Sequence, residues 1–174
     1  MTVMRSDDLA LPWRTASSWQ EAVRTLDRLV EGHGASLNAA RDEAHLIHAR
    51  LERLFPDLDA LCRVTCTRCA APCCLHAAVY ADFRDLLFWT LAGVSSPPGQ
   101  LRRHSKESCR FSSPRGCTLA RMQRPWICTW YLCADQWAVL RRWDPHERQR
   151  FEGLLEEVRT GRKEMEEAFL RAVA

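Results

Sequence analysis

The sequence lacks features that mark several classes of protein. No apolar stretch reaches the roughly 18 residues that a membrane-spanning helix needs. The amino terminus carries Asp7 and Asp8 and has no apolar run long enough for the core of a signal peptide. These absences predict a cytoplasmic protein that makes no contact with a membrane.

Several enzyme signatures are also missing. The chain has no glycine-rich nucleotide loop, no C-x3-C-x2-C radical motif and no carboxylate–histidine pair in a recognisable arrangement. A net charge of +3 is too small to indicate nucleic-acid binding by itself. Hydrophobic residues make up 47% of the chain and charged residues 27%, a balance typical of a globular protein, and the length suits one domain.

Apolar residues at helical spacing predict helices near the amino terminus. Ser18 and Glu21 fit a capping box for a first helix that ends at about Val30, before two glycines. Ser36 fits the cap of a second helix, whose apolar stripe continues until Pro56.

Two aspartates predict further helix starts. Asp82 is expected to cap a short apolar helix over 83–91, and a flexible connection over 95–99 follows it. Asp144, with Pro145 at the first helical position, is expected to start a long helix that reaches the carboxyl terminus.

We therefore predict a mainly α protein, with helices at both termini packed around a cysteine-rich, loop-dominated metal-binding centre. Residues 1–16 are expected to form a loose tail and 17–174 a single domain. Within this domain, 62–133 is the cysteine-cluster core and 144–173 is the long C-terminal helix. The apolar stripe of that helix suits the core and a homodimer face equally.

Nine cysteines are the strongest chemical feature of the sequence. Without an export signal they lie in a reducing compartment, where metal binding or redox chemistry is commoner than a disulfide framework. Cys66 and Cys69 form a C-x2-C pair, the local geometry of zinc knuckles and many iron–sulfur sites. Pro72 favours a loop here. Because the adjacent Cys73 and Cys74 are expected to point in divergent directions, binding by both to one ion is harder than a split between two metals, or between ligand and core.

A second group of cysteines follows along the chain. Cys109 and Cys117 flank a tight reversal that contains proline and glycine, which brings two more thiolates together. Inside one helix Cys128 and Cys133 would point about 140° apart. Cys128 is therefore expected to precede a helix and Cys133 to lie in its first turns. Cys62 stands outside this dense pattern and suits a ligand and a core residue equally.

Tryptophans and arginines near these cysteines allow two readings each. Trp126, Trp130 and Trp137 would lie along one helical face beside Cys133, as ordinary core or as a dry shell around a cluster. Because such a dry shell would shield a cluster from solvent, we favour an iron–sulfur cluster over one or two zinc ions. Seven basic residues over 102–124 form a solvated face or offset the negative charge of a thiolate-bound metal.

The order of the cysteine motifs over 66–133 resembles a known family. The motifs are Cys66-x2-Cys69-x3-Cys73-Cys74, Cys109-Arg-Phe, Gly116-Cys117-Thr-Leu and Arg124-Pro125-x2-Cys128. They resemble the YkgJ-like family of bacterial zinc- or iron-chelating cysteine-cluster proteins, which is similar to the cysteine-rich part of flagellin lysine methylase. The resemblance implies the metal ligands Cys66, Cys69, Cys73, Cys74, Cys109, Cys117 and Cys128. Cys133 is added from spacing alone. The chain departs from the family pattern at the glycine-free spacer 70–72, at Leu119 and at Thr129.

These features predict a metal-binding cysteine-cluster protein with an iron–sulfur cluster, acting in electron transfer, redox sensing or metal handling with a protein or redox partner. One alternative is a methylase-like enzyme or enzyme subunit that uses the cluster. Another is a structural zinc module for protein interaction. Nucleic acid is not expected as a partner, because the sequence has no stacking-aromatic or groove-helix signature.

Overall fold

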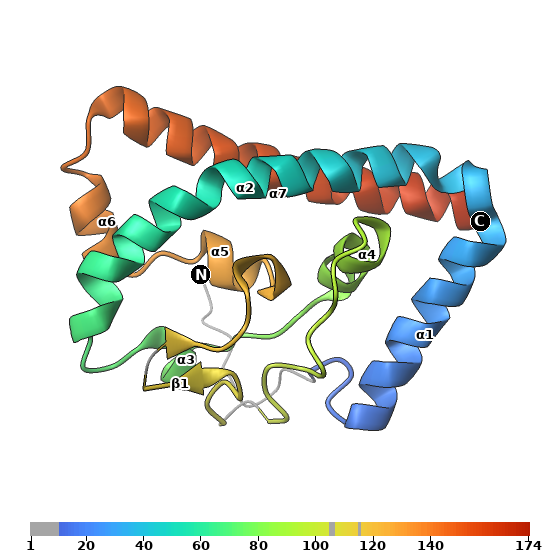
Figure 1. Ribbon diagram of the computed structural model, residues 1–174, viewed down its shortest axis with the longest axis horizontal. Coiled ribbons are helices and arrows are strands. Elements are labelled where there is room, and N and C mark those ends of the chain that lie inside the picture. The colour runs from blue at the N-terminus through green and yellow to red at the C-terminus, as the bar shows by residue number, and fades with distance from the viewer. Residues whose placement is uncertain (1–10, 105–106, 115) are drawn as a thin grey trace, which may run out of the picture.

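The structure is a computed structural model that describes residues 11–104, 107–114 and 116–174. It is mainly helical, with two very short strands (Figure 1). The longer helices are α1 (Ala16–His33), α2 (Asn38–Thr65), α4 (Phe83–Leu91), α6 (Ala134–Leu140) and α7 (Pro145–Val173). The short elements are η1 (Gly34–Leu37), η2 (Cys66–Arg68), α3 (Cys73–His76), β1 (Ser112–Ser113), β2 (Gly116–Cys117), η3 (Arg121–Gln123) and α5 (Ile127–Trp130).

The long helices α2 and α7 form the backbone of the fold. They run antiparallel along one edge of the molecule (Figure 1). Their apolar stripes face each other, so that Ile47 and Leu54 of α2 and Phe151 and Val158 of α7 are all buried. Burying a side chain of this size is worth about 1.5–3 kcal/mol, which makes this pair the main source of stability.

Helices α1 and α4 extend the core away from this pair. Trp19 of α1 is 2% exposed and lies 6.4 Å from Trp89 of α4, measured between ring centroids. The Trp19 indole N–H donates to the carbonyl of Pro97 at 3.0 Å.

Among the described residues, no helix is both long and apolar enough to cross a membrane.

The predicted starts of α4 and α7 are confirmed. The Asp82 side chain accepts a hydrogen bond from the Asp85 backbone N–H at 2.9 Å, and Asp144 accepts from two backbone N–H groups of the first turn of α7. Both carboxylates satisfy donors that the helix itself leaves without partners.

Of the expected tail, residues 1–10 lie outside the described residues, and Leu11 is buried.

The predicted capping box of α1 is wrong by three residues. Thr15, not Ser18, is the N-cap, and Ser18 is the residue whose side chain reaches back to the Thr15 backbone N–H. Glu21 instead contacts Arg24 and Arg28 on the exposed surface of the helix. Two candidate boxes overlap here, and only packing of the chain at Trp13 and Trp19 selects between them.

The predicted end of α2 at Pro56 is also wrong, since the helix continues to Thr65. Pro56 is exposed, so water can solvate the carbonyl group that its missing N–H leaves free. Leu54, Leu58 and Leu61 are buried on either side of it. The packing of these leucines continues on both sides of Pro56 and outweighs the free-energy cost of proline inside a helix.

The predicted flexible connection over 95–99 is packed instead. Gly93, with φ at +67°, ends α4, and the N–H of Val94 donates back to the Trp89 carbonyl at 2.9 Å. Pro97 and Gly99 are buried. The next residue, Gln100, is 1% exposed and binds both backbone groups of Ala81 through its side chain.

Candidate metal centre

The short elements that carry most of the cysteines lie on one side of the α2–α7 pair (Figure 1). Five stretches of chain supply the cysteines. They are the end of α2 with η2 (Cys62, Cys66, Cys69), α3 (Cys73, Cys74), the segment before β1 (Cys109), β2 (Cys117), and α5 with the N-cap of α6 (Cys128, Cys133). All nine are free thiols.

The hairpin β1–β2 confirms the predicted reversal between Cys109 and Cys117. The strands pair antiparallel with Ser112 opposite Cys117, and Gly116 has φ at +104°, a conformation that favours glycine. Cys109 also donates its backbone N–H to the Cys74 carbonyl at 2.8 Å. This bond ties the second group of cysteines to the first.

The predicted placement of Cys128 and Cys133 around one helix start is wrong. Cys128 lies inside the one-turn helix α5, and Cys133 is the N-cap of a separate helix, α6. Three residues, 131–133, lie between the two helices. Because of this break, the 140° angle between side chains five residues apart in one helix does not apply to Cys128 and Cys133.

Cys62 and Cys66 form the first of two hydrogen-bonded thiol pairs. The Cys66 thiol donates to the Cys62 sulfur and so lowers the pKa of Cys62 to about 5, while the same bond raises the pKa of Cys66. Arg121 adds to the effect on Cys62 through its guanidinium, 3.4 Å from the sulfur. Cys133 is close enough to raise the pKa of Cys66 further.

Cys73 and Cys74 form the second pair. The Cys73 thiol donates to Cys74, which lowers the pKa of Cys74 to about 6 and raises that of Cys73. Burial raises the pKa of Cys109 and of Cys128. Negative charge on Cys74 would raise the pKa of both, so the two lie within electrostatic reach of it.

Seven of the eight predicted ligands thus interact with another cysteine. Cys117 belongs to this set because it influences both Cys109 and Cys128, and Cys66 links the two pairs because it influences Cys73. Cys69 is the exception: its side chain is exposed and takes part in no side-chain hydrogen bond or electrostatic contact with the described residues. Within the same residues, no three His, Cys, Asp or Glu side chains converge as the ligands of one metal ion would.

Positive charge faces these thiols from the basic stretch. Arg121 and Arg124 lower the pKa of Cys62, and Arg102, which is 2% exposed, acts against the raised pKa of Cys109. Arg103 and Arg110 are exposed. Part of the stretch is therefore solvent-exposed and part lies beside thiols, while Lys106 and Arg115 lie outside the described residues.

The tryptophans do not form the predicted stripe. Trp126 precedes α5, while Trp130 and Trp137 lie on different helices and are 46% and 37% exposed. The break between α5 and α6 destroys the helical spacing on which the prediction depended. Half-exposed rings do not make a dry shell, so the tryptophans favour neither an iron–sulfur cluster nor zinc.

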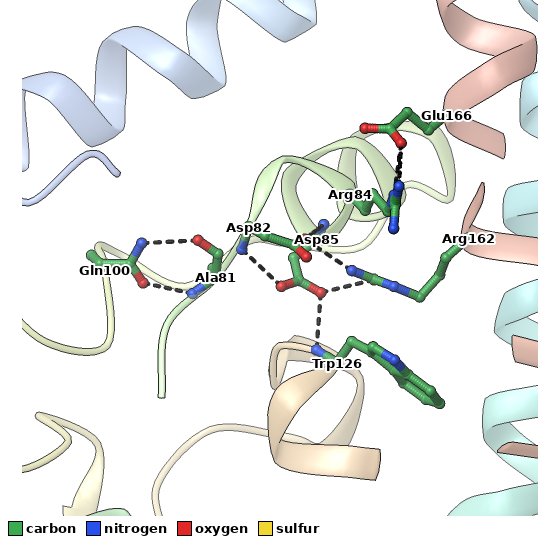
Figure 2. A network of polar contacts seen from close by, with 8 residues as sticks. All are labelled: Ala81, Asp82, Arg84, Asp85, Gln100, Trp126, Arg162 and Glu166. Atoms are coloured by element: carbon green, nitrogen blue, oxygen red, sulfur yellow. Dashed lines mark hydrogen bonds and ion pairs between the residues drawn. The ribbon is translucent and has the colours of Figure 1, made fainter. Parts of the chain in front are cut away.

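A buried polar network that the sequence did not reveal supports the second group of cysteines (Figure 2). Asp85, buried at the start of α4, accepts hydrogen bonds from the backbone N–H groups of Asp82 and Trp126. Arg162 of α7 pairs with Asp85 at 2.8 Å and with Asp82 at 2.9 Å. Asp85 thereby fixes the chain two residues before Cys128. The only signal in the sequence is that Asp85 lies three residues after the predicted cap Asp82.

No protein-family model, curated protein or solved structure matches this chain.

Proposed function

We propose that this chain binds a metal centre through its cysteine thiolates, either an iron–sulfur cluster or one or two zinc ions. The observation that carries the proposal is the assembly of cysteines from five separate stretches of chain into one mutually interacting group. A single buried cysteine is ordinary core, but core packing does not require so many thiols together.

The chemistry of this group fits a thiolate-bound metal. Thiolate sulfur is the ligand that zinc and iron–sulfur clusters prefer, and the ligands must lose their protons to bind. Arg121 and Arg124 offset the resulting negative charge. Metal binding would draw together cysteines of η2, α3 and the β1–β2 hairpin.

The exposure of the site favours exchange with a partner over catalysis in a closed cavity. Cys66 and Cys73 are exposed, and so are Trp130 and Tyr131 at the end of α5. A partner protein could therefore approach the centre directly, as electron transfer, redox sensing or metal handling requires. The resemblance to YkgJ-like proteins agrees with this use. The methylase-like enzyme and the structural zinc module are the competing proposals.

Anaerobic purification followed by an absorption spectrum and by iron, sulfide and zinc analysis of the same sample tests the proposal. A brown protein with stoichiometric iron and sulfide would support the proposal and identify the centre as an iron–sulfur cluster. A colourless protein with stoichiometric zinc would keep the metal centre and reject the cluster. A protein that contains no metal and takes up neither zinc nor iron and sulfide on reconstitution would contradict the proposal. Cys128→Ser is the matched variant, expected to lower the metal content.

A further inference from the structure

Cys62 and Cys66 are placed as a pair by α2. They lie four residues apart at the carboxyl end of the helix, so their side chains share one face. The two sulfurs are within hydrogen-bonding distance of each other. Two cysteines one helical turn apart present their sulfurs to the same region of space without any change in the backbone.

Hydrogen-bond donors from two distant segments reach these sulfurs. Arg121 Nη2 lies 3.4 Å from Cys62 Sγ, and Arg121 is itself held by Asp59, whose carboxylate accepts from Nε at 2.7 Å. Gln136 Nε2 lies 3.6 Å from Cys62 Sγ and 3.9 Å from Cys66 Sγ. A cysteine that only fills a core does not need charged and amide donors. A metal-bound thiolate does, because such outer contacts orient the sulfur.

Gln136 connects this pair to a third cysteine. Its Oε1 accepts a hydrogen bond from the backbone N–H of Cys133 at 3.1 Å, so the amide is fixed at both ends. Gln136 is buried although it is polar. One glutamine side chain therefore contacts the sulfurs of Cys62 and Cys66 and the backbone of Cys133, while the predicted ligand Cys69 is exposed and takes no part.

We propose that Cys62 is a ligand of the metal centre, paired with Cys66 across the last turn of α2, and that Arg121 and Gln136 are positioning residues for the two sulfurs. In this arrangement Cys69 is not a ligand. Each thiol releases its proton to solvent as the metal–sulfur bond forms, so no electrons are transferred. This inference rests on the proposed function, because it assigns a ligand to the same centre.

A cobalt(II) titration of the metal-free protein tests the assignment. Cobalt bound to thiolates absorbs in proportion to the number of metal–sulfur bonds. We expect Cys62→Ser to lose the share of one thiolate and to bind cobalt at least about 10- to 100-fold more weakly, the range known for loss of an outer contact. Cys69→Ser, the matched control, should leave both quantities unchanged. Gln136→Ala should weaken binding with the thiolate count unchanged.

A second measurement on the wild-type chain covers the case in which Cys62→Ser does not fold. Cysteines are alkylated with and without bound metal, and the modified positions are identified by mass spectrometry. Metal should protect Cys62 and leave Cys69 reactive. Protection of Cys69 but not Cys62, or a folded Cys62→Ser protein with the absorption and affinity of the wild type, would overturn the assignment. A wild-type chain that binds no metal would instead reject the proposed function.

Discussion

At the scale of single residues, the buried Asp85–Arg162 pair is the most consequential contact outside the cysteines. The side chains of both are 5% exposed, and the pair joins α4 to α7. Removing charges from water is costly. The cost is offset here because Asp85 also accepts hydrogen bonds from two backbone N–H groups and Arg162 has a second partner in Asp82. Replacing either Asp85 or Arg162 is therefore expected to lower the stability of the folded protein.

Arg162→Met is therefore expected to destabilise the protein by about 3–5 kcal/mol, since it leaves the Asp85 carboxylate buried without a counter-charge. Denaturant unfolding measures the loss. The control is Arg159→Met on the same helix, which removes an ion pair with Glu156 that is fully exposed and should leave the unfolding free energy nearly unchanged. Equal effects of the two substitutions would show that Arg162 acts only through its aliphatic packing.

The same carboxylate predicts a pH dependence. Burial raises the pKa of Asp85 from 3.8 to about 6, against the opposing effect of Arg162. The folded state then binds the proton more tightly than the unfolded state, so this contribution to stability is full below pH 3.8 and is lost as the pH rises through about 6. At 1.36 kcal/mol for each pKa unit, the loss is at most about 3 kcal/mol.

Unfolding free energies of the wild type and Asp85→Asn, measured from pH 4 to pH 7, test this pH dependence. Because asparagine does not titrate, the stability of the wild type relative to the variant should fall across this range. A difference that stays constant, or that grows with pH, would mean that Arg162 and the backbone donors outweigh burial.

At the scale of elements, α2 shows how tertiary packing overrides a helix breaker. Figure 1 shows the helix running beside α7 and then turning toward the cysteine-rich side of the molecule. Pro56 lies inside it, exposed to solvent, and proline is the usual cause of such a change in direction. The last turns of α2, which carry Cys62 and Cys66, lie beyond this point.

Pro56→Ala is expected to raise the unfolding free energy by about 1–3 kcal/mol, because alanine restores the missing backbone hydrogen bond and favours the helix. Thermal or denaturant unfolding of the metal-free protein measures this gain. Ala49→Ser, at an exposed site of the same helix, serves as a control for the effect of a surface change. A loss of stability in Pro56→Ala would indicate that the packing of α2 against α6 and α7 depends on the bend.

At the scale of the whole molecule, the hydrophobic core and the cysteine group are largely separate. The buried side chains of α1, α2, α4 and α7 form a continuous cluster. Among the cysteines, Cys109 is buried in it and Cys74 and Cys128 pack against it. A zinc finger has no such core and unfolds without its metal. This protein has a core that can fold without one.

Removal of the proposed metal by a chelator should therefore leave the helical circular dichroism signal and a cooperative thermal transition in place. The transition temperature should fall, because bound metal stabilises the folded state by about 2.7 kcal/mol when free metal is at roughly 100 times its Kd. Proteolytic cleavage should begin between η2 and α3 and near the β1–β2 hairpin. Global loss of helix on chelation would show that the cysteine group, rather than the α2–α7 pair, organises the fold.

The sequence by itself determined the features that depend on neighbours along the chain. Apolar periodicity predicted the helical class, and the side chains of Asp82 and Asp144 predicted two helix starts, because a cap satisfies backbone groups within three residues of itself. Pro114 and Gly116 predicted the reversal before Cys117, because a hairpin is also a local structure.

Only the tertiary structure decided what depends on distant partners. It carried α2 through Pro56, divided the segment around Cys128 into two short helices, and placed Asp85 against Arg162. It also places Cys62 among the interacting cysteines, while Cys69 is exposed and outside that group. The physical reason is that burial and hydrogen bonds between segments far apart in sequence can exceed the one to three kcal/mol that local preferences contribute, and no local pattern records those partners.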